Sequence, residues 1–420
     1  MNLTVRDVER TWVDVPFREV ARRNMIRELP HFSVFEICRV TLECGVTGVG
    51  ETMCFYTLDE VTDETVRRAM GRSAAELLWD DSLGAGLQMA LFDAVAKAND
   101  VPIHRLLRPQ VRREVPVSWW AVDMNLDDWL SECREALSRG HISFKYKARP
   151  WWDLRAQLRQ VTAETPDYPE IDLDFNTMCG DAAHAVRILA DLERFSQVKI
   201  FESPIPQRDV AGNKYLREHV NVPIAMHVGN PPLATALMEN VCDGFVVAGG
   251  ATRTLQETCV IAEHDKVCFL QHTGTGLAAI WSAHFGAVST HARWPAVNCD
   301  TLFEHNLLKD PLPVTNGLLP VPEAPGLGVQ LDEDAIQRYR IEPIRKPYPH
   351  QGLLIRISWE NGAEDYYAHG RQYWYDYWEP RRPLFVPGVK MDLIPDDGSD
   401  GWQRLYQEAL KKPEWVTQQN

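Results

Sequence analysis

The sequence predicts an α/β protein whose middle part is a closed parallel barrel. From Val115 onward, short runs rich in β-branched and aromatic residues alternate with polar segments long enough for one helix. This alternation is typical of parallel strands joined by crossover helices, and eight such strands can close into a barrel. We expect the barrel over residues 116–330, with helices over, for example, 126–139 and 181–194. The candidate strands begin near Val115, Ile142, Ile171, Val198, Val222, Gly244, Val267 and Trp294.

The residues before the barrel predict a smaller α+β domain over 1–115. Alternating apolar and polar residues over 33–54 predict two strands with a turn at Glu43-Cys44-Gly45, and helices are expected over 59–70 and 82–99. Such a domain could cap the barrel. The irregular segment 16–32 carries four arginines, Arg22 among them. They could bind an anionic substrate or simply face solvent.

The segment from 331 to 420 combines a short helix with an aromatic-rich tail. The helix, expected over 332–339, should return to the capping domain. Asn361-Gly362 lies between two strand-like runs, Leu353–Ser358 and Asp365–Ala368, which predicts a β-hairpin. We expect the tail to pack on the capping domain or at a subunit interface. A substrate lid is the alternative.

Composition excludes several functional classes. The 420 residues carry a formal net charge of -15, which argues against nucleic acid or an anionic membrane as the main partner. No apolar run approaches the roughly 18 residues of a membrane span, and the first residues lack an apolar signal core. Nine cysteines occur without a C-x-x-C pair, as expected for reduced thiols. We expect a cytoplasmic protein that acts on a small molecule.

Three charged motifs close three successive predicted strands. They are Lys145-Tyr146-Lys147, Asp174-Phe175-Asn176 and Glu202-Ser203-Pro204. Side chains two apart on a strand share a face, so the two lysines should point the same way. Because the carboxyl ends of parallel strands meet at one rim, lysines and carboxylates should gather there, where barrel enzymes have their active sites.

In order and spacing, these motifs resemble those of the enolase superfamily, in its mandelate racemase and muconate lactonizing branch. The resemblance covers about residues 1–340. It implies a modified TIM barrel with a capping domain built from the amino-terminal region and the carboxyl-terminal tail. It also implies that Asp174 and Glu202 hold one divalent cation, Mg²⁺ in most of the family. Lys145 would neutralise the substrate carboxylate, Lys147 would move a proton and Asn176 would contact the substrate.

Such residues suit removal of a proton from the carbon next to a carboxylate. That hydrogen is weakly acidic and the carboxylate is already negative, so the reaction needs a base and a nearby cation. Lys147 could be the base, and a divalent ion could act as the Lewis acid. Strand-end lysines and acids that merely face solvent are the alternative reading.

The sequence departs from the family's pattern at strands five, six and eight. Where a third metal-binding carboxylate is expected, residues 225–230 offer His227 first and Asn230 second. An imidazole ligand would weaken Mg²⁺ relative to Mn²⁺ or a later transition metal. At strand eight, Asn298 is the nearest polar replacement for an acid that would bind the substrate.

His272, at the end of strand seven, lies where the branch often places a catalytic histidine. It could act as a second base or as the acid that protonates a leaving hydroxyl, although a histidine that is only hydrogen-bonded in the rim is the alternative. The strand-six segment offers Ala248 where an orienting aspartate is usual. Trp119, after strand one, could contact a polyhydroxylated substrate or pack in the core.

We therefore expect a metal-dependent lyase that dehydrates a sugar acid. The missing partner of His272 counts against a racemase or epimerase of a 2-hydroxy acid, which needs two well-oriented bases. A weakened relative that only binds an anionic metabolite is a further alternative. The expected partner is a small anionic carboxylate, with no nucleic acid or membrane, and the chain is expected to form a homo-oligomer.

Overall fold

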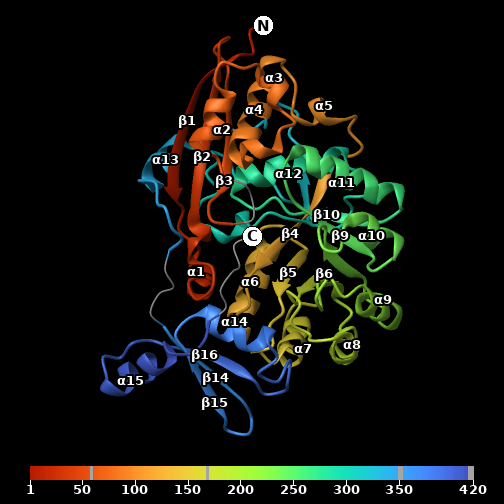
Figure 1. The fold of residues 1–420 in the computed structure, drawn as a ribbon, viewed down its shortest axis with the longest axis vertical. Coiled ribbons are helices and arrows are strands. Elements are labelled where there is room, and N and C mark those ends of the chain that lie inside the picture. Colours follow the sequence, from red (N-terminus) through yellow and green to blue (C-terminus); the bar gives the residue numbers. More distant parts are fainter. Residues whose placement is uncertain (57–59, 167–169, 349–352, 415–420) are drawn as a thin grey trace.

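The computed structural model describes residues 1–56, 60–166, 170–348 and 353–414, which form three units along the chain (Figure 1). The amino-terminal domain, red to orange, and the carboxyl-terminal unit, blue, lie at opposite ends of the molecule, with the barrel extending from one toward the other. Within the described ranges no helix is long and apolar enough to cross a membrane. The division at 115/116 and 330/331 remains our proposal for the domain boundaries.

The barrel contains the eight parallel strands that the sequence predicts, each beginning within two residues of its predicted start. Neighbouring strands pair in the order β10-β9-β8-β7-β6-β5-β4-β11. A parallel bridge between Cys268 and Ala292 links β10 to the segment that enters β11, so the barrel is nearly closed. Its strands are β4 (Glu114–Ala121), β5 (Ser143–Lys147), β6 (Glu170–Asp174), β7 (Val198–Glu202), β8 (Ile224–His227), β9 (Gly244–Val247), β10 (Val267–Leu270) and β11 (Ala296–Val297). A short strand, β12 (Leu318–Pro320), pairs with β4 in the antiparallel sense.

The barrel helices start where the sequence supplies a capping side chain. Asn125, Asp153, Asp181 and Asp209 each accept a hydrogen bond from a first-turn backbone N–H, which satisfies a donor that the helix itself leaves free. The helices are α6 (Leu126–Ser138), α7 (Leu154–Glu164), α8 (Ala182–Leu192), α9 (Val210–His219), α10 (Leu233–Met238), α11 (Ala251–Glu263) and α12 (Gly276–Val288). The helices expected over 126–139 and 181–194 are confirmed.

The amino-terminal domain is an antiparallel sheet of order β13-β1-β2-β3 with helices on it. Gly48 lets the sheet approach α4 closely, because a Cβ there would lie 2.1 Å from the carbonyl oxygen of Ala90. As predicted, the helix after residue 331 returns to this domain, where β13 pairs with β1. The strands are β1 (Val5–Asp14), β2 (Val34–Leu42), β3 (Thr47–Met53) and β13 (Arg340–Ile341). The helices are α1 (Glu19–Met25), α2 (Asp63–Ala69), α3 (Ala74–Leu77), α4 (Ala85–Ala98), α5 (His104–Leu107) and α13 (Glu333–Tyr339).

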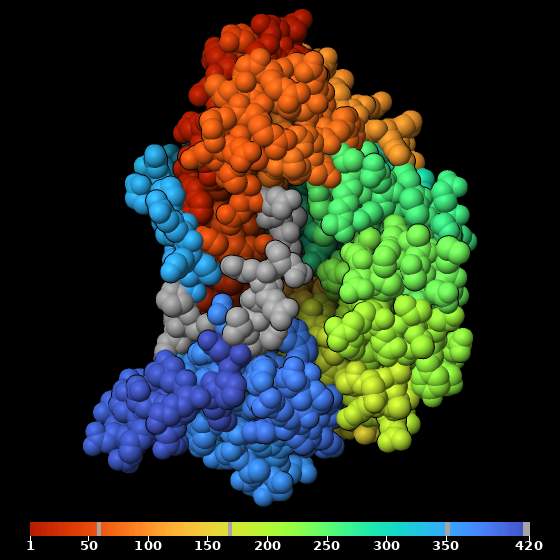
Figure 2. Space-filling view, viewed as in Figure 1, coloured from red at the N-terminus to blue at the C-terminus, as the bar shows by residue number. Residues whose placement is uncertain are grey.

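The carboxyl-terminal unit has a small sheet of its own, of order β15-β14-β16, and two helices. The hairpin predicted around Asn361-Gly362 is present as β14 and β15. We expected this segment on the capping domain or at a subunit interface. Its Tyr373 contacts Arg27 and Glu28 of the capping domain, and its apolar core is shared with Trp151, Trp152 and Met178 of the barrel. In Figure 2 the unit, in blue, abuts the yellow part of the barrel. Its elements are β14 (Leu354–Ser358), β15 (Glu364–Tyr367), β16 (Lys390–Ile394), α14 (Gly370–Trp378) and α15 (Asp400–Ala409).

Glu51 joins the capping domain to the barrel. This buried carboxylate at the end of β3 accepts hydrogen bonds from the backbone N–H groups of Thr275 and Ala278, both at 2.7 Å, and from the Thr275 hydroxyl. It thereby supplies acceptors to the first turn of α12, which has no side-chain cap of its own. Burial raises the pKa of Glu51 from its ordinary value near 4.5 to about 7, although these hydrogen bonds oppose the rise.

The raised pKa of Glu51 predicts a pH-dependent stability. The folded state binds this proton more tightly than the unfolded state, so the contribution is complete below pH 4.5 and is lost as pH rises through about 7. We expect Glu51→Gln, which keeps an acceptor but cannot ionise, to flatten this part of the profile. Urea unfolding at several pH values measures the effect. Identical profiles for the two proteins between pH 4.5 and 7 would contradict it.

Candidate active site

Lysines and carboxylates gather at the carboxyl ends of β5, β6 and β7, as the sequence predicts. In the register of the sheet Lys145 pairs with Asp172, Lys147 pairs with Asp174, and Asp174 pairs with Glu202. Period-two alternation points all of these side chains to the same side of their strands. The three motifs therefore form one cluster at the barrel mouth.

The two lysines make different contacts within this cluster. Lys145 Nζ donates to Glu202 and lies 3.5 Å from Asp174 Oδ2, with only 1% of its side chain exposed. Lys147 Nζ donates to Asp174 Oδ2 and, at 3.1 Å, to Asn176 Oδ1, and 16% of its side chain is exposed. Lys147 is therefore the lysine that can meet a bound molecule.

Electrostatics hold the cluster in a defined charge state. Burial alone would lower the pKa of Lys145, but Glu202, Asp174 and Asp172 outweigh it and raise that pKa. Burial opposes ionisation of Asp174, yet the charges of Lys147, Lys145 and Arg149 hold its pKa well below the usual range. Asp172 has the opposite balance, because burial and the charge of Glu202 raise its pKa well above the usual range. Asp172 therefore ionises less readily than Asp174 beside it.

A cavity of about 690 Å³ opens beside Lys147 and is walled by all three units of the chain. Lys147, Arg149, Asn176 and Trp120 come from the barrel. His31, Phe32, Phe55 and Tyr56 come from the amino-terminal domain, and Tyr348, Arg371, Trp374 and Trp378 come from the chain after β13. Its lining is largely aromatic with several cations, which suits a carboxylate that has a sizeable apolar part.

Arg149 is a site residue that the sequence reasoning missed. Its Nη2 donates to Asn176 Oδ1 at 2.7 Å, the same atom that accepts from Lys147. Its guanidinium lies 4.7 Å from the ring centroid of Trp374. The signal was available, because position 149 continues the alternation of Lys145 and Lys147 beyond the strand end.

His272 does not join the cluster, which corrects its expected placement. Along β10 and the residues after it, Phe269 lies 5.0 Å below Lys145 Nζ and Gln271 Oε1 lies 3.4 Å from the same atom. Alternation therefore turns His272 outward, where its Nε2 lies 3.2 Å from the hydroxyl of Thr254 on α11. Burial lowers the pKa of His272 to about 4. Gln271, not His272, is the side chain that this segment brings to the lysines.

The expected substrate contacts of Trp119 and Arg22 are also corrected. Trp119 is buried outside the barrel and donates to Glu132 on α6, because Trp120 is the residue of the pair that faces inward to the cavity. Arg22 lies on the exposed side of α1 and does not line the cavity. Asn298 is buried near the barrel mouth, and its Oδ1 has no hydrogen-bond partner among the described residues.

His227 ends β8 with its Nε2 3.1 Å from Glu202 Oε1. Gln207 fixes its backbone, accepting from the His227 N–H and donating to the His227 carbonyl. Asp174 is separated from this pair by the Lys145 ammonium. Across the described ranges, no group of three or more His, Cys, Asp or Glu side chains is placed to hold a metal ion.

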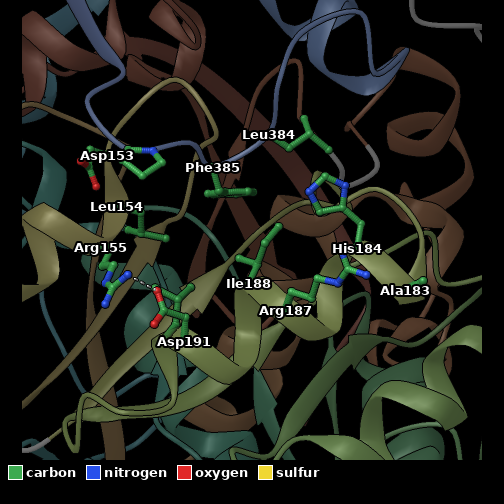
Figure 3. A pocket seen from close by; sticks show the side chains of 12 residues that line it. Asp153, Leu154, Arg155, Ala183, His184, Arg187, Ile188, Asp191, Leu384 and Phe385 are labelled. Atoms are coloured by element: carbon green, nitrogen blue, oxygen red, sulfur yellow. Dashed lines mark ion pairs between the residues drawn. The ribbon is translucent and has the colours of Figure 1, made fainter. Parts of the chain in front are cut away.

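A second cavity, of about 420 Å³, lies between α7, α8 and residues 384–387 (Figure 3). Its labelled side chains include an ion pair between Arg155 and Asp191, whose closest atoms are 3.1 Å apart. None of the predicted site residues lines it. The cavity beside Lys147 is therefore the candidate active site.

The chain is similar in sequence and fold to known proteins. Residues 128–335 match the family described as Enolase C-terminal domain-like. Chloromuconate cycloisomerase from Cupriavidus pinatubonensis is 25% identical over 363 aligned positions, and the match covers 78% of this chain and 96% of that protein. D-galactonate dehydratase from Xanthomonas oryzae pv. oryzae is 24% identical over 351 residues, covering 73% and 91%. The muconate lactonizing enzyme from Pseudomonas fluorescens, solved with muconolactone, superposes with a TM-score of 0.67 at 21% identity, covering 81% and 100%.

The family match runs from residue 128, within α6, to residue 335, so it includes barrel strands β5 to β11 but neither β4 nor the carboxyl-terminal unit. The matched residues contain seven of the eight barrel strands. The relatives named above are cycloisomerases and a dehydratase, which are isomerases and lyases. This chain belongs to the enolase superfamily.

Proposed function

We propose that this chain is a lyase that removes the proton next to a carboxylate and dehydrates a hydroxy acid, such as the sugar acid expected from the sequence. The observation that carries the proposal is the position of Lys147. Its amine reaches the cavity, and hydrogen bonds to Asp174 and Asn176 fix its position. A positioned amine beside cationic side chains suits abstraction of a weakly acidic C–H proton.

The proposed reaction uses one face of the substrate. In the structure the Lys147 ammonium is ion-paired with Asp174, so the reaction requires it to give up a proton first; the amine then takes the α-proton, and the ammonium that re-forms donates to Asp174 Oδ2 and Asn176 Oδ1. The electron pair of the C–H bond forms a double bond between the α and β carbons as the β-hydroxyl leaves. Lys147 returns its proton to that hydroxyl, which departs as water. Arg149, at the same end of the cavity, would stabilise the negative charge that develops on the carboxylate.

The position of His272 supports a dehydratase over a racemase. Exchanging a proton between two faces needs a second base across the substrate from the first. His272 points away from the cavity, toward α11. One base is sufficient for an elimination in which the same lysine takes and returns the proton. A relative that binds its ligand without turnover is the alternative class.

Enzymes of the enolase superfamily generally bind a divalent metal, typically Mg²⁺. The ligand set proposed for this chain is Asp174, Glu202 and His227. As arranged, these three do not fit a metal ion, because the ammonium of Lys145 already lies between the two carboxylates. Binding would require Lys145 to leave that position, and the mechanism above uses no metal.

The competition between Lys145 and a metal ion predicts the effect of removing its charge. We expect the natural protein to bind Mg²⁺ and Mn²⁺ weakly in calorimetric titrations. Lys145→Met should bind them at least about tenfold more tightly, because two carboxylates lose their counter-ion. Adding Asp174→Asn to that variant should remove the gain. Tight Mg²⁺ binding by the natural protein, unchanged in Lys145→Met, would contradict the competition.

Lys147 is expected to be the base. Hydroxy acids, sugar acids among them, are screened in deuterated water for exchange of the α-hydrogen, followed by NMR. Lys147→Arg keeps a cation for Asp174, but a guanidinium does not deprotonate, so exchange should fall by about 10² to 10⁴. His272→Gln is the matched variant outside the cavity and should exchange at the natural rate. Exchange that survives in Lys147→Arg and is lost in His272→Gln would reverse the assignment.

A further inference from the structure

We propose that the carboxyl-terminal unit is a wall of the active site that recognises the end of the substrate remote from Lys147. The acid selected would have a planar, apolar body and a second anionic group. This inference rests on the proposed function, because Lys147 marks the reacting end of the cavity. It refines the substrate class, since a polyhydroxylated chain alone would leave most of this wall unused.

The wall is built into the structure by buried polar contacts among the three units. Arg27 of the amino-terminal domain donates to Asp123 of the barrel and to the hydroxyl of Tyr373 on α14. Tyr373 in turn donates to Glu28 at 2.8 Å. All four side chains are almost completely buried. Leaving the buried charges of Arg27 and Glu28 without the Tyr373 hydroxyl would cost free energy, so this network fixes the position of α14.

A second set of contacts joins the wall to the reacting end. Trp378 Nε1 donates to the carbonyl oxygen of Asn176 at 2.9 Å. The guanidinium of Arg149 stacks over Trp374. Asn176, which accepts from Lys147, and Arg149, which donates to the same Asn176 oxygen, are therefore both in direct contact with α14. A substrate held at Lys147 would extend along these tryptophans.

Aromatic rings line the cavity in two groups, one on each side. Phe32 lies against Tyr56, with ring centroids 4.6 Å apart, and approaches Trp120 at 6.5 Å. On the facing unit, Trp374 and Trp378 lie 4.7 Å apart. Such rings pair well with a planar apolar group. A cavity of about 690 Å³ also exceeds what a short hydroxylated chain would fill.

Arg371 supplies the second positive charge. It is exposed at the start of α14, lines the cavity, and makes no ion pair or side-chain hydrogen bond within the described residues. His31, also in the lining, stays neutral near pH 7, because burial and the charge of Arg371 lower its pKa to about 4. A guanidinium without a partner, facing a ligand cavity, is suited to a carboxylate or phosphate. The far end of the substrate is therefore expected to be anionic.

Four acids test the body and the second charge separately. They are phenyllactate, 4-carboxyphenyllactate, gluconate and glucarate, which combine an aromatic or hydroxylated body with one or two carboxylates. Binding is measured by calorimetry, so that turnover is not needed. We expect 4-carboxyphenyllactate to bind most tightly. Arg371→Gln should weaken its binding by about tenfold or more and leave phenyllactate unchanged.

Trp374→Leu should weaken both aromatic acids and spare the hydroxylated ones. Arg381→Gln is the matched control, because Arg381 lies on the same unit but contacts Tyr375 outside the cavity. It should bind all four acids as the natural protein does.

If gluconate bound as tightly as 4-carboxyphenyllactate, the inference that the substrate has an apolar body would be wrong. An equal loss for one-charge and two-charge acids in Arg371→Gln would overturn the role of Arg371. Selective binding without α-hydrogen exchange in any acid would overturn the lyase and leave the wall in place.

Discussion

The buried charges of the barrel mouth must be neutralised within the protein, and this constraint organises the site. Asp174 and Glu202 are inaccessible to water, so each requires a cation at contact distance. Lys145 serves both, and Lys147 serves Asp174 from the side of the cavity. For Asp172, burial and the charge of Glu202 raise the pKa well above its usual range, so this carboxyl ionises less readily than that of Asp174. The charge balance leaves one amine, that of Lys147, at the surface where a substrate can reach it.

The same constraint explains how the carboxyl-terminal unit is attached. Asp123 accepts from Arg27 and from the indole N–H groups of Trp151 and Trp152, both at 2.7 Å. Those tryptophans then pack against the rings of the tail. Trp151 and Trp152 thus do two things at once: their N–H groups satisfy the buried Asp123, and their rings bury the apolar side chains of the tail. The three units come into contact at these residues.

The barrel could be predicted from the sequence because strand and helix periods are local properties. Each strand start was located within two residues, and the three motifs were brought together because parallel strand ends share a rim. What a local pattern does not give is the side on which a residue at the strand end points. The expected roles of Trp119 and His272 each differ by one position from Trp120 and Gln271, which face inward. A shift of one residue reverses the face of a strand. The tail's place depends on contacts far apart in sequence, such as Tyr373 with Arg27, which no local pattern contains.

The contact between α14 and Arg27 also orders the assembly of the protein in time. Synthesis runs from the amino end, and barrel strands can pair while later residues are still being made. Arg27 can pair with Asp123 at that stage, but its other partner, Tyr373, is made only when the chain extends some forty residues past the barrel. A substrate cavity with all its walls exists only after that point. All residues that line the cavity are present once the chain has been made past Trp378, and a chain that stops before α14 presents a barrel without this wall.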